Sequence, residues 1–302
     1  FVSMAEPNLA ALETTFTAEN WSGNLQVISA LNGRLTNSGV ARYRQLNNQH
    51  LEPITAQSVD GETILLKVET SQSHISIAEA ARTRIFCGDE HIRLEPRVKV
   101  KSGHISQEYS INLEKAHPIT IEKVVSLVNS RDHAISGVGI EAQKKVLRAE
   151  GFTQLLKQHS LRWDHLWQRC RTAITDNNRT ALILNLHIFH LLQTISPNTI
   201  DIDTSVPARG LHGEAYHGHI FWDELFIFPF LNLRIPDITR ALLMYRYRRL
   251  SEARWSAKEA GYKGAMFPWQ SGSDGREETQ TLHLNPNSGR WIPDRSHRQR
   301  HI

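Results

Sequence analysis

The spacing of hydrophobic and polar positions changes near residue 130. Before that point, short runs rich in β-branched residues alternate partly with polar ones, as in segments 62–70 and 119–128. The pairs Asn32-Gly33 and Ser38-Gly39 are typical of turns between strands. This pattern predicts half-buried strands in an antiparallel β-sandwich.

After residue 132 the apolar residues recur at helical spacing. Segment 139–170 can line one apolar stripe with Leu155, Leu156, Trp163, Leu166 and Trp167. Further helix-length segments are 180–195 and 235–261; the second has Pro236 near its start and Gly261 where a helix would end. The sequence therefore predicts an all-β part followed by an all-α part.

Composition narrows the class of protein. With 302 residues, 40% hydrophobic and 22% charged, the chain can hold roughly two globular domains. The formal net charge of +4 is small, and much of it lies in segment 289–302, so a nucleic-acid partner is not expected. No apolar run approaches the roughly 18 residues of a membrane span, so no membrane partner is expected either.

The cysteines and the two ends of the chain add two expectations. Cys87 and Cys170 lie far apart and outside any CxxC motif, which favours a reducing compartment, and we expect a cytoplasmic protein. The chain begins at Phe1 and ends at Ile302 after a dense polar cluster, which suggests a piece of a larger protein.

Aromatic, histidine and carboxylate side chains gather in four segments: 21–25, 212–226, 264–280 and 289–294. A pyranose presents an apolar C–H face and a ring of hydroxyls, so aromatic rings beside Asp, Glu, Gln and Arg suit a sugar site. In the helical part these segments look like loops, where sites usually lie. The alternative is that Trp222 and Trp269 are core aromatics and that the His217–His219 pair is structural; we predict no metal site.

Two stretches resemble a known family. "ARGLHGEAYHGHIFWDELF" and "ALLMYRYRRLSEARWSAKEAGYKGAMFPWQSGSDGREE" resemble the catalytic core of glycoside hydrolase family 65, and segment 10–46 resembles the later part of that family's N-terminal β-sandwich. The family contains maltose, kojibiose, nigerose, trehalose and trehalose 6-phosphate phosphorylases, with some hydrolases. The resemblance implies the later portion of a β-sandwich domain (1–130), linker helices (131–179) and the first part of a catalytic (α/α)6 barrel (180–302).

The resemblance also assigns roles to the aromatic and polar residues. Trp222 and Asp223 of the "FWD" motif would bind the glucosyl unit whose bond is cut, an anionic Asp being a strong acceptor for sugar hydroxyls. The other residues expected to complete or support the pocket are His217, His219, Trp269 and Gln270.

The family also needs a carboxylic acid that protonates the glycosidic oxygen. Many members carry "G-x-E" and then "W-E-I" and "E-I-H" stretches, whereas this chain has Gly275-Arg276-Glu277-Glu278 followed by "RWIPD" and "RQRHI". Glu277 is therefore the first candidate for the acid, Glu278 the second, and Asp294 the third.

The sequence leaves the attacking group open. An inverting hydrolase needs a second carboxylate to activate water, whereas a phosphorylase can use inorganic phosphate, which is already an anion. We expect phosphorolysis of an α-linked glucose disaccharide such as trehalose, a trehalose phosphate, maltose or kojibiose, with phosphate as co-substrate and no cofactor. The full-length protein is expected as a homodimer.

Two alternatives remain. One is a trehalase-like hydrolase. The other is a non-catalytic sugar-binding fragment, because a barrel that lacks helices would expose apolar faces. On either interpretation the 302-residue chain alone is expected to be inactive.

Overall fold

The computed structural model describes residues 1–40, 47–174, 178–207, 218–221, 223–279, 281–285 and 287–293. The chain divides into two compact units. The first comprises Phe1–Thr36 and Gln49–Asp164, and the second comprises Asn37–Asn48 and His165–Ile302. Because Asn37–Asn48 is grouped with the second unit, the chain passes between the units at three points rather than one.

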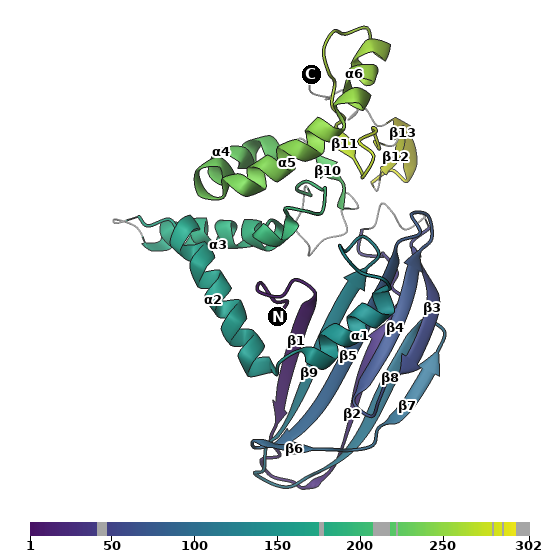
Figure 1. Cartoon of the computed structure of the whole chain (residues 1–302), viewed down its shortest axis with the longest axis vertical. Coiled ribbons are helices and arrows are strands. Elements are labelled where there is room, and N and C mark those ends of the chain that lie inside the picture. Colours follow the sequence, from purple (N-terminus) through teal and green to yellow (C-terminus); the bar gives the residue numbers. More distant parts are fainter. Residues whose placement is uncertain are drawn as a thin grey trace. The chain divides into compact units, whose positions relative to one another are not determined.

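The first unit is built on two antiparallel sheets (Figure 1). The larger sheet has the order β1-β9-β5-β4-β3, with β6 beside β5, and the smaller has the order β2-β8-β7. The strands are β1 (Leu9–Phe16), β2 (Gly23–Asn32), β3 (Leu51–Ser58), β4 (Thr63–Thr70), β5 (Ser76–Cys87), β6 (Glu90–Ile92), β7 (Arg97–Lys101), β8 (His104–Leu113) and β9 (Ile119–Asn129). The predicted β-sandwich is confirmed.

Apolar side chains fill the space between the two sheets. Ile85 and Ile121 of the larger sheet pack with Tyr109 and Ile111 of β8. A second cluster joins residues of β4 to Leu31 of β2 and Ile105 of β8. Interdigitation of the two inner faces is the usual way in which a sandwich buries its core.

Helix α1 (Val138–Arg148) covers the opposite face of the larger sheet (Figure 1). Its buried residues Val138, Ala142 and Val146 follow one helical stripe and pack on Ala78 and Val124. The central strands are therefore covered on both faces, and consecutive residues of β4 from position 64 to 66 are at most 4% exposed. The prediction that segment 62–70 is half-buried was wrong, because a helix covers its second face.

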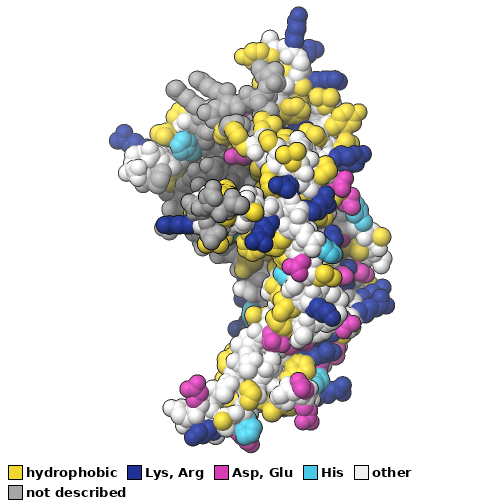
Figure 2. All heavy atoms as spheres, turned by 90° about the vertical axis from the view of Figure 1, so that its left-hand side faces the viewer, with side chains coloured by type: hydrophobic (Ala, Val, Ile, Leu, Met, Phe, Trp, Pro, Cys, Tyr) yellow, Lys and Arg dark blue, Asp and Glu magenta, His cyan; other side chains and the backbone are white. Residues whose placement is uncertain are grey.

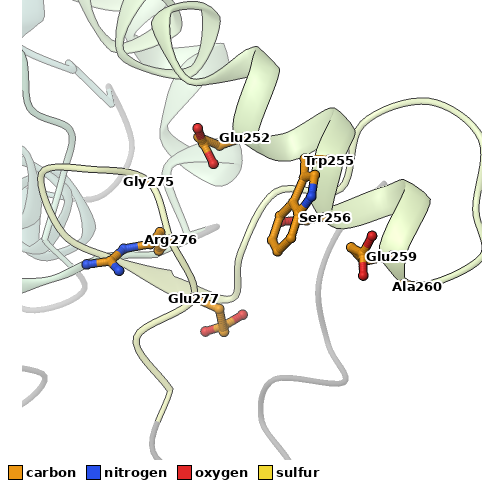
Figure 3. A pocket seen from close by; sticks show the side chains of 8 residues that line it. All are labelled: Glu252, Trp255, Ser256, Glu259, Ala260, Gly275, Arg276 and Glu277. Atoms are coloured by element: carbon orange, nitrogen blue, oxygen red, sulfur yellow. The ribbon is translucent and has the colours of Figure 1, made fainter.

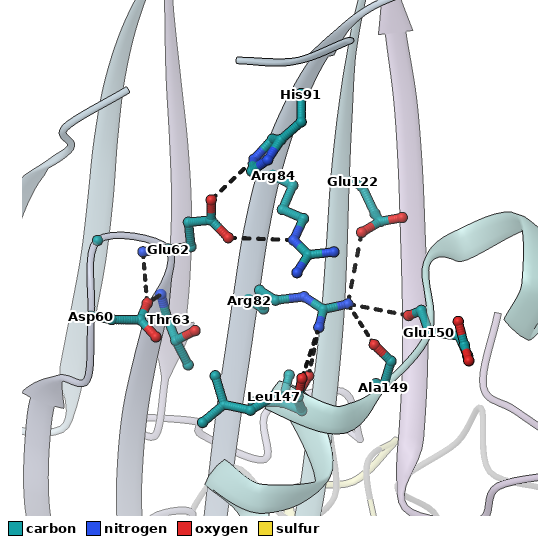
Figure 4. A network of polar contacts seen from close by, with 12 residues as sticks. Asp60, Glu62, Thr63, Arg82, Arg84, His91, Glu122, Leu147, Ala149 and Glu150 are labelled. Carbon is teal, nitrogen blue, oxygen red and sulfur yellow. Dashed lines mark hydrogen bonds and ion pairs between the residues drawn. The ribbon is translucent and has the colours of Figure 1, made fainter. Parts of the chain in front are cut away.

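A buried arginine binds the C-terminal end of α1 (Figure 4). Arg82 of β5 is 3% exposed, and its guanidinium donates to the carbonyl oxygens of residues 146, 147, 149 and 150 at 2.9–3.4 Å. These carbonyls at and just after the end of the helix would otherwise lack partners. The charge also suits the negative end of the helix dipole.

Glu122, which lies beside Arg82, binds the first residue of the next helix, α2 (Phe152–Cys170). Glu122 Oε2 accepts from the backbone N–H of Phe152 at 2.6 Å, and its other oxygen lies 4.0 Å from Arg82. A Cβ at Gly151 would lie 2.9 Å from Glu122 Oε2, so glycine is required for this close approach. Along α2, Leu155 and Leu166 are buried as the predicted stripe requires, but Leu156 is 39% exposed and lies off it.

The second unit contains helices and short strands. The helices after α2 are α3 (Asn178–Thr194), α4 (Glu224–Arg234), α5 (Pro236–Arg248) and α6 (Leu250–Glu259). The short strands are β10 (Ile220–Phe221), β11 (Gln270–Ser271), β12 (Leu282–Asn285) and β13 (Arg290–Pro293), which pair as β10–β11 and β12–β13. A β-sandwich followed by a mainly helical part is confirmed, whereas the prediction that the second part is all-α was wrong.

Large apolar side chains lie on the surface of these helices. Leu182 of α3 is 70% exposed, Phe226 and Leu233 of α4 are 70% and 85% exposed, and Tyr247 of α5 is 67% exposed. Figure 2 shows a face of the molecule on which hydrophobic side chains reach the surface among Lys and Arg. No helix in the described part of the chain has the length and hydrophobicity needed to cross a bilayer.

Candidate functional site

The β10–β11 ribbon brings together two of the segments expected to form the site. Phe221 pairs with Gln270 and Ile220 pairs with Ser271, although they lie about fifty positions apart in the chain. Phe221 is 2% exposed, and its ring meets the ring of Trp269 edge-on at 6.0 Å between centroids. The segment that leads into Asp223 therefore lies directly beside the segment that contains Trp269.

Asp223 is the residue before α4, and its side chain is exposed and makes no capping hydrogen bond to the helix. This places a carboxylate at the end of the ribbon. Trp222, His217 and Asp294 lie outside the described residues, so their predicted roles stay predictions.

His219 and Gln270 contact each other across the ribbon. The Gln270 side-chain amide donates to Nδ1 of His219, which makes Nδ1 an acceptor and Nε2 the protonated nitrogen. Burial lowers the pKa of His219, which favours the same neutral ring. The structure therefore brings together two of the residues expected to support the pocket and fixes their mutual orientation.

Glu277 lies beside the same ribbon, and both oxygens of its carboxylate already accept hydrogen bonds. Oε2 accepts from the backbone N–H of Trp269 at 2.9 Å, and Oε1 accepts from the N–H groups of Gln270 at 3.3 Å and Thr279 at 3.1 Å and from the Thr279 hydroxyl. All of these partners donate, and an ionised carboxylate is the form that only accepts. This arrangement favours a role for Glu277 in holding Trp269 and Gln270 over the role of a proton donor.

Glu278 has different surroundings. Its backbone N–H donates to the Gln270 carbonyl at 2.9 Å, which continues the ribbon, while its side chain is exposed. Of the two adjacent carboxylates, Glu277 and Glu278, the one on Glu278 is accessible to solvent. The turn before it depends on Gly275, which has a φ of 81° and whose Cβ would lie 2.7 Å from Arg249.

Helix α5 supports the ribbon with residues that the sequence analysis did not select. The Tyr245 hydroxyl contacts Ser271 Oγ at 3.1 Å and donates to the Gly272 carbonyl. Arg246 Nε donates to Glu224 Oε1 at 2.6 Å, and the residues of this pair are 9% and 2% exposed. Burial raises the pKa of Glu224, and the Arg246 guanidinium opposes the rise. The sequence feature that could have identified Glu224 is its position directly after the "FWD" motif.

A pocket of about 350 Å³ adjoins Glu277 (Figure 3). The turn 275–277 forms one side, and α6 forms the other with Glu252, Trp255, Ser256 and Glu259. Trp255 is 62% exposed, so its indole offers a free apolar surface beside carboxylates that can accept from hydroxyls. Asp223 is not among the residues that line this pocket.

Within the described ranges, no three His, Cys, Asp or Glu side chains are arranged to hold a metal ion.

The chain matches two domain models of one family. The N-terminal domain of glycosyl hydrolase family 65 matches residues 1–166, and the central catalytic domain of that family matches residues 185–302. The chain belongs to glycosyl hydrolase family 65. The ribbon, Asp223 and the turn 275–278 all lie within the match to the family's catalytic domain.

Relatives within family 65 are longer than this chain. An uncharacterized glycosyl hydrolase of Mycobacterium tuberculosis is 46% identical over 302 residues, which is 100% of this chain and 23% of that protein. The trehalose 6-phosphate phosphorylase of Lactococcus lactis subsp. lactis is 30% identical over all of this chain and 40% of its own length. The chain thus spans less than half the length of these relatives.

A solved structure shares the family 65 fold. A putative kojibiose phosphorylase from the human microbiome has a TM-score of 0.78 and 21% identity, covering 92% of this chain and 35% of that one. At this identity the likeness concerns the fold.

Proposed function

We propose that the whole protein is an inverting α-glucoside phosphorylase that cleaves a glucose disaccharide with inorganic phosphate and releases β-glucose 1-phosphate. The observation that carries the proposal is the pairing of Phe221 with Gln270, because it joins the segment leading into Asp223 to Trp269 in a chain of family 65. A carboxylate, an aromatic ring and an amide on one ribbon are suited to a glucosyl unit. No cofactor is needed for this reaction.

The proposed roles follow from the surroundings of each side chain. Asp223 accepts hydrogen bonds from the hydroxyls of the glucosyl unit, with Trp222 beside it in sequence. Trp269 and Gln270 complete this part of the site, and Glu277 holds both of their backbone N–H groups. His219 orients Gln270. The helices of the second unit would form the first part of an (α/α)6 barrel.

We assign the proton donor to the Glu277–Glu278 pair and favour Glu278. Bond cleavage at the anomeric carbon leaves an alkoxide-like oxygen on the departing sugar, which a general acid protonates as it forms. The side chain of Glu278 is exposed and accessible to a substrate, whereas the carboxylate of Glu277 already accepts hydrogen bonds from the backbone N–H groups of Trp269 and Thr279. The pocket lined by Trp255 is our candidate site for the departing sugar unit.

The experiment is incubation of the whole protein with trehalose, trehalose 6-phosphate, maltose and kojibiose, each with and without inorganic phosphate. We expect cleavage of one of them only with phosphate, and β-glucose 1-phosphate as the product identified by NMR. Equal rates without phosphate would identify a hydrolase. Sugar binding without cleavage of any α-glucoside would favour a non-catalytic sugar-binding protein.

A further inference from the structure

One side chain of α5 contacts the elements on both sides of Asp223. Arg246 Nε donates to the carboxylate of Glu224, and its Nη2 donates to the backbone carbonyl of Phe221 at 3.3 Å. Asp223 lies between these two residues in sequence, so both ends of its short segment are tied to one planar guanidinium.

The same guanidinium also faces the segment that leads into the second strand of the ribbon. Its central carbon lies 5.7 Å from the centre of the Phe267 ring, two residues before Trp269. The preceding residue on the helix, Tyr245, bonds Ser271 and the Gly272 carbonyl. Two consecutive residues of α5 therefore hold β10, the start of α4 and β11, which together carry the residues of the proposed site.

The Arg246–Glu224 pair makes its contact through one oxygen of the carboxylate. Glu224 Oε2 is buried and has no hydrogen-bond partner among the described residues, so the carboxylate is directed to Arg246 through one oxygen only. An arginine presents its donors in a fixed plane and can hold two acceptors at once, whereas a lysine is a point charge on a flexible stem. The geometry at Asp223 thus depends on the shape of this side chain as well as on its charge.

We infer that Arg246 is a positioning residue of the proposed sugar site, which fixes Asp223 through Glu224 and the Phe221 carbonyl and so sets the affinity for the glucosyl unit. The inference rests on the proposed function for the identity of the ligand. A displacement of a binding group by about 1 Å can cost two orders of magnitude in rate, so a small loss of order at this segment has a measurable effect.

The test compares Arg246→Lys with the wild type in the whole protein. D-glucose is the probe, its Kd is measured by calorimetry well below the melting temperature, and kcat and KM are measured on the disaccharide that is cleaved. We expect the Kd and KM to rise about tenfold while kcat changes less, because the ground-state contact of Asp223 is misplaced. Amide exchange of segments 218–224 and 266–272 should become faster.

Two further variants make the result specific. Arg240→Lys carries the same change at an exposed position of the same helix and should leave the Kd for glucose unchanged. If Arg246→Lys does not fold, Glu224→Gln replaces it, because the amide keeps an oxygen for Arg246 and removes the charge. A folded Arg246→Lys or Glu224→Gln with wild-type affinity for glucose overturns the inference.

The proposed function is judged separately. A wild-type protein that binds glucose but cleaves no α-glucoside contradicts the proposed function, and the comparison of Kd values then still decides the role of Arg246. Loss of melting temperature without a change in Kd would mean that the pair only stabilises the fold and would also overturn the inference.

Discussion

Each unit of the protein contains a buried arginine–glutamate pair, and the two pairs differ in what the arginine binds. Arg82 donates mainly to four backbone carbonyls, and its carboxylate partner Glu122 stands 4.0 Å away and binds α2 instead. Arg246 bonds its partner Glu224 directly at 2.6 Å and donates to a single carbonyl next to the proposed site. The first pair joins helices to a sheet, and the second contacts the segment of the proposed site.

The two units also differ in how far they bury their apolar side chains. The first unit buries its apolar residues between two sheets and under α1, whereas the helices of the second unit expose large apolar side chains such as Leu182 and Leu233. We therefore expect changes in the first unit to affect stability and changes in the second unit to affect rate or affinity. Three experiments test this division, and a fourth measures a small contribution of the second unit to stability.

The largest effect is expected at the candidate proton donor. Glu278→Gln should lower kcat on the disaccharide by roughly 10²- to 10⁴-fold with little change in melting temperature, since Gln has no proton to give. The loss should be smaller with α-glucosyl fluoride, whose leaving group needs little protonation. Steady-state rates on both donors measure this difference.

Glu277→Gln is the matched comparison for this experiment. It should lose activity on both donors, because the new NH₂ group would face backbone N–H donors. If instead Glu277→Gln is rescued by the fluoride and Glu278→Gln is active, Glu277 is the acid, as the sequence predicts. If neither variant responds, the acid is Asp294 or lies beyond residue 302.

The second experiment removes the arginine of the first unit. Arg82→Met leaves four carbonyls without this donor and the buried Glu122 without its counter-charge, so the free energy of unfolding of this unit should fall by about 3–5 kcal/mol. The slowest amide exchange rates in β5 and β9 report this quantity. The rate of sugar cleavage should be unchanged while the protein is folded.

The control for Arg82 is Arg84 on the same strand. Arg84 is partly exposed and pairs with Glu62 at 3.3 Å, so Arg84→Met should cost less than about 1 kcal/mol. Similar losses of unfolding free energy for the two variants would contradict the prediction that the carbonyl contacts of Arg82 stabilise the first unit.

A smaller effect is expected in the pocket beside Glu277. Trp255→Ala should raise KM for the disaccharide roughly five- to tenfold with kcat nearly unchanged, because an exposed aromatic platform contributes about 1 kcal/mol to binding. Tyr247→Ala, which removes an equally exposed aromatic ring from α5, serves as the control and should leave KM unchanged. Equal effects of the two substitutions would rule out the pocket as a sugar site.

The smallest effect is a dependence of stability on pH. Burial lowers the pKa of His219, so the ring stays neutral in the folded state at a pH where the unfolded chain is already protonated. Its stabilising contribution is therefore present above the ordinary histidine value of about 6.5 and is lost as the pH falls below it. The melting temperature of wild type minus that of His219→Gln should decrease between pH 8 and pH 5; a constant difference would contradict this.

Local patterns predicted the regular elements well. The strands at 63–70 and 119–129 and the helices α1, α2 and α3 were predicted because their apolar spacing is set by neighbours in the sequence. Helix α4 was not, because "ELFIFPFLNLR" is apolar on most sides and contains Pro229, so it has no clear helical period. The ribbon was missed because two-residue strands depend on pairing between distant segments.

The segments that carry the candidate site residues could be selected from the sequence, but their pairing could not. Trp269, Gln270, Glu277 and His219 were selected from residue types and the family resemblance, and the structure brings their segments together. The predicted roles of these residues are not tested by the structure. Arg246 and Tyr245 could not be selected, because an arginine in an amphipathic helix is normally exposed and only the packing of the ribbon explains its burial.

The grouping of Asn37–Asn48 with the second unit affects any attempt to divide the protein. A cut at the junction 164/165 would leave this segment attached to the sandwich, where Thr36 bridges Gln49 and the Asn37 N–H bonds the Asn48 carbonyl at its base. A catalytic unit expressed from residue 165 onward would lack it. Exchanging the second unit between relatives would therefore require transplanting two pieces of sequence together, because a chimera that carries only the longer piece would combine parts of this unit from different parents.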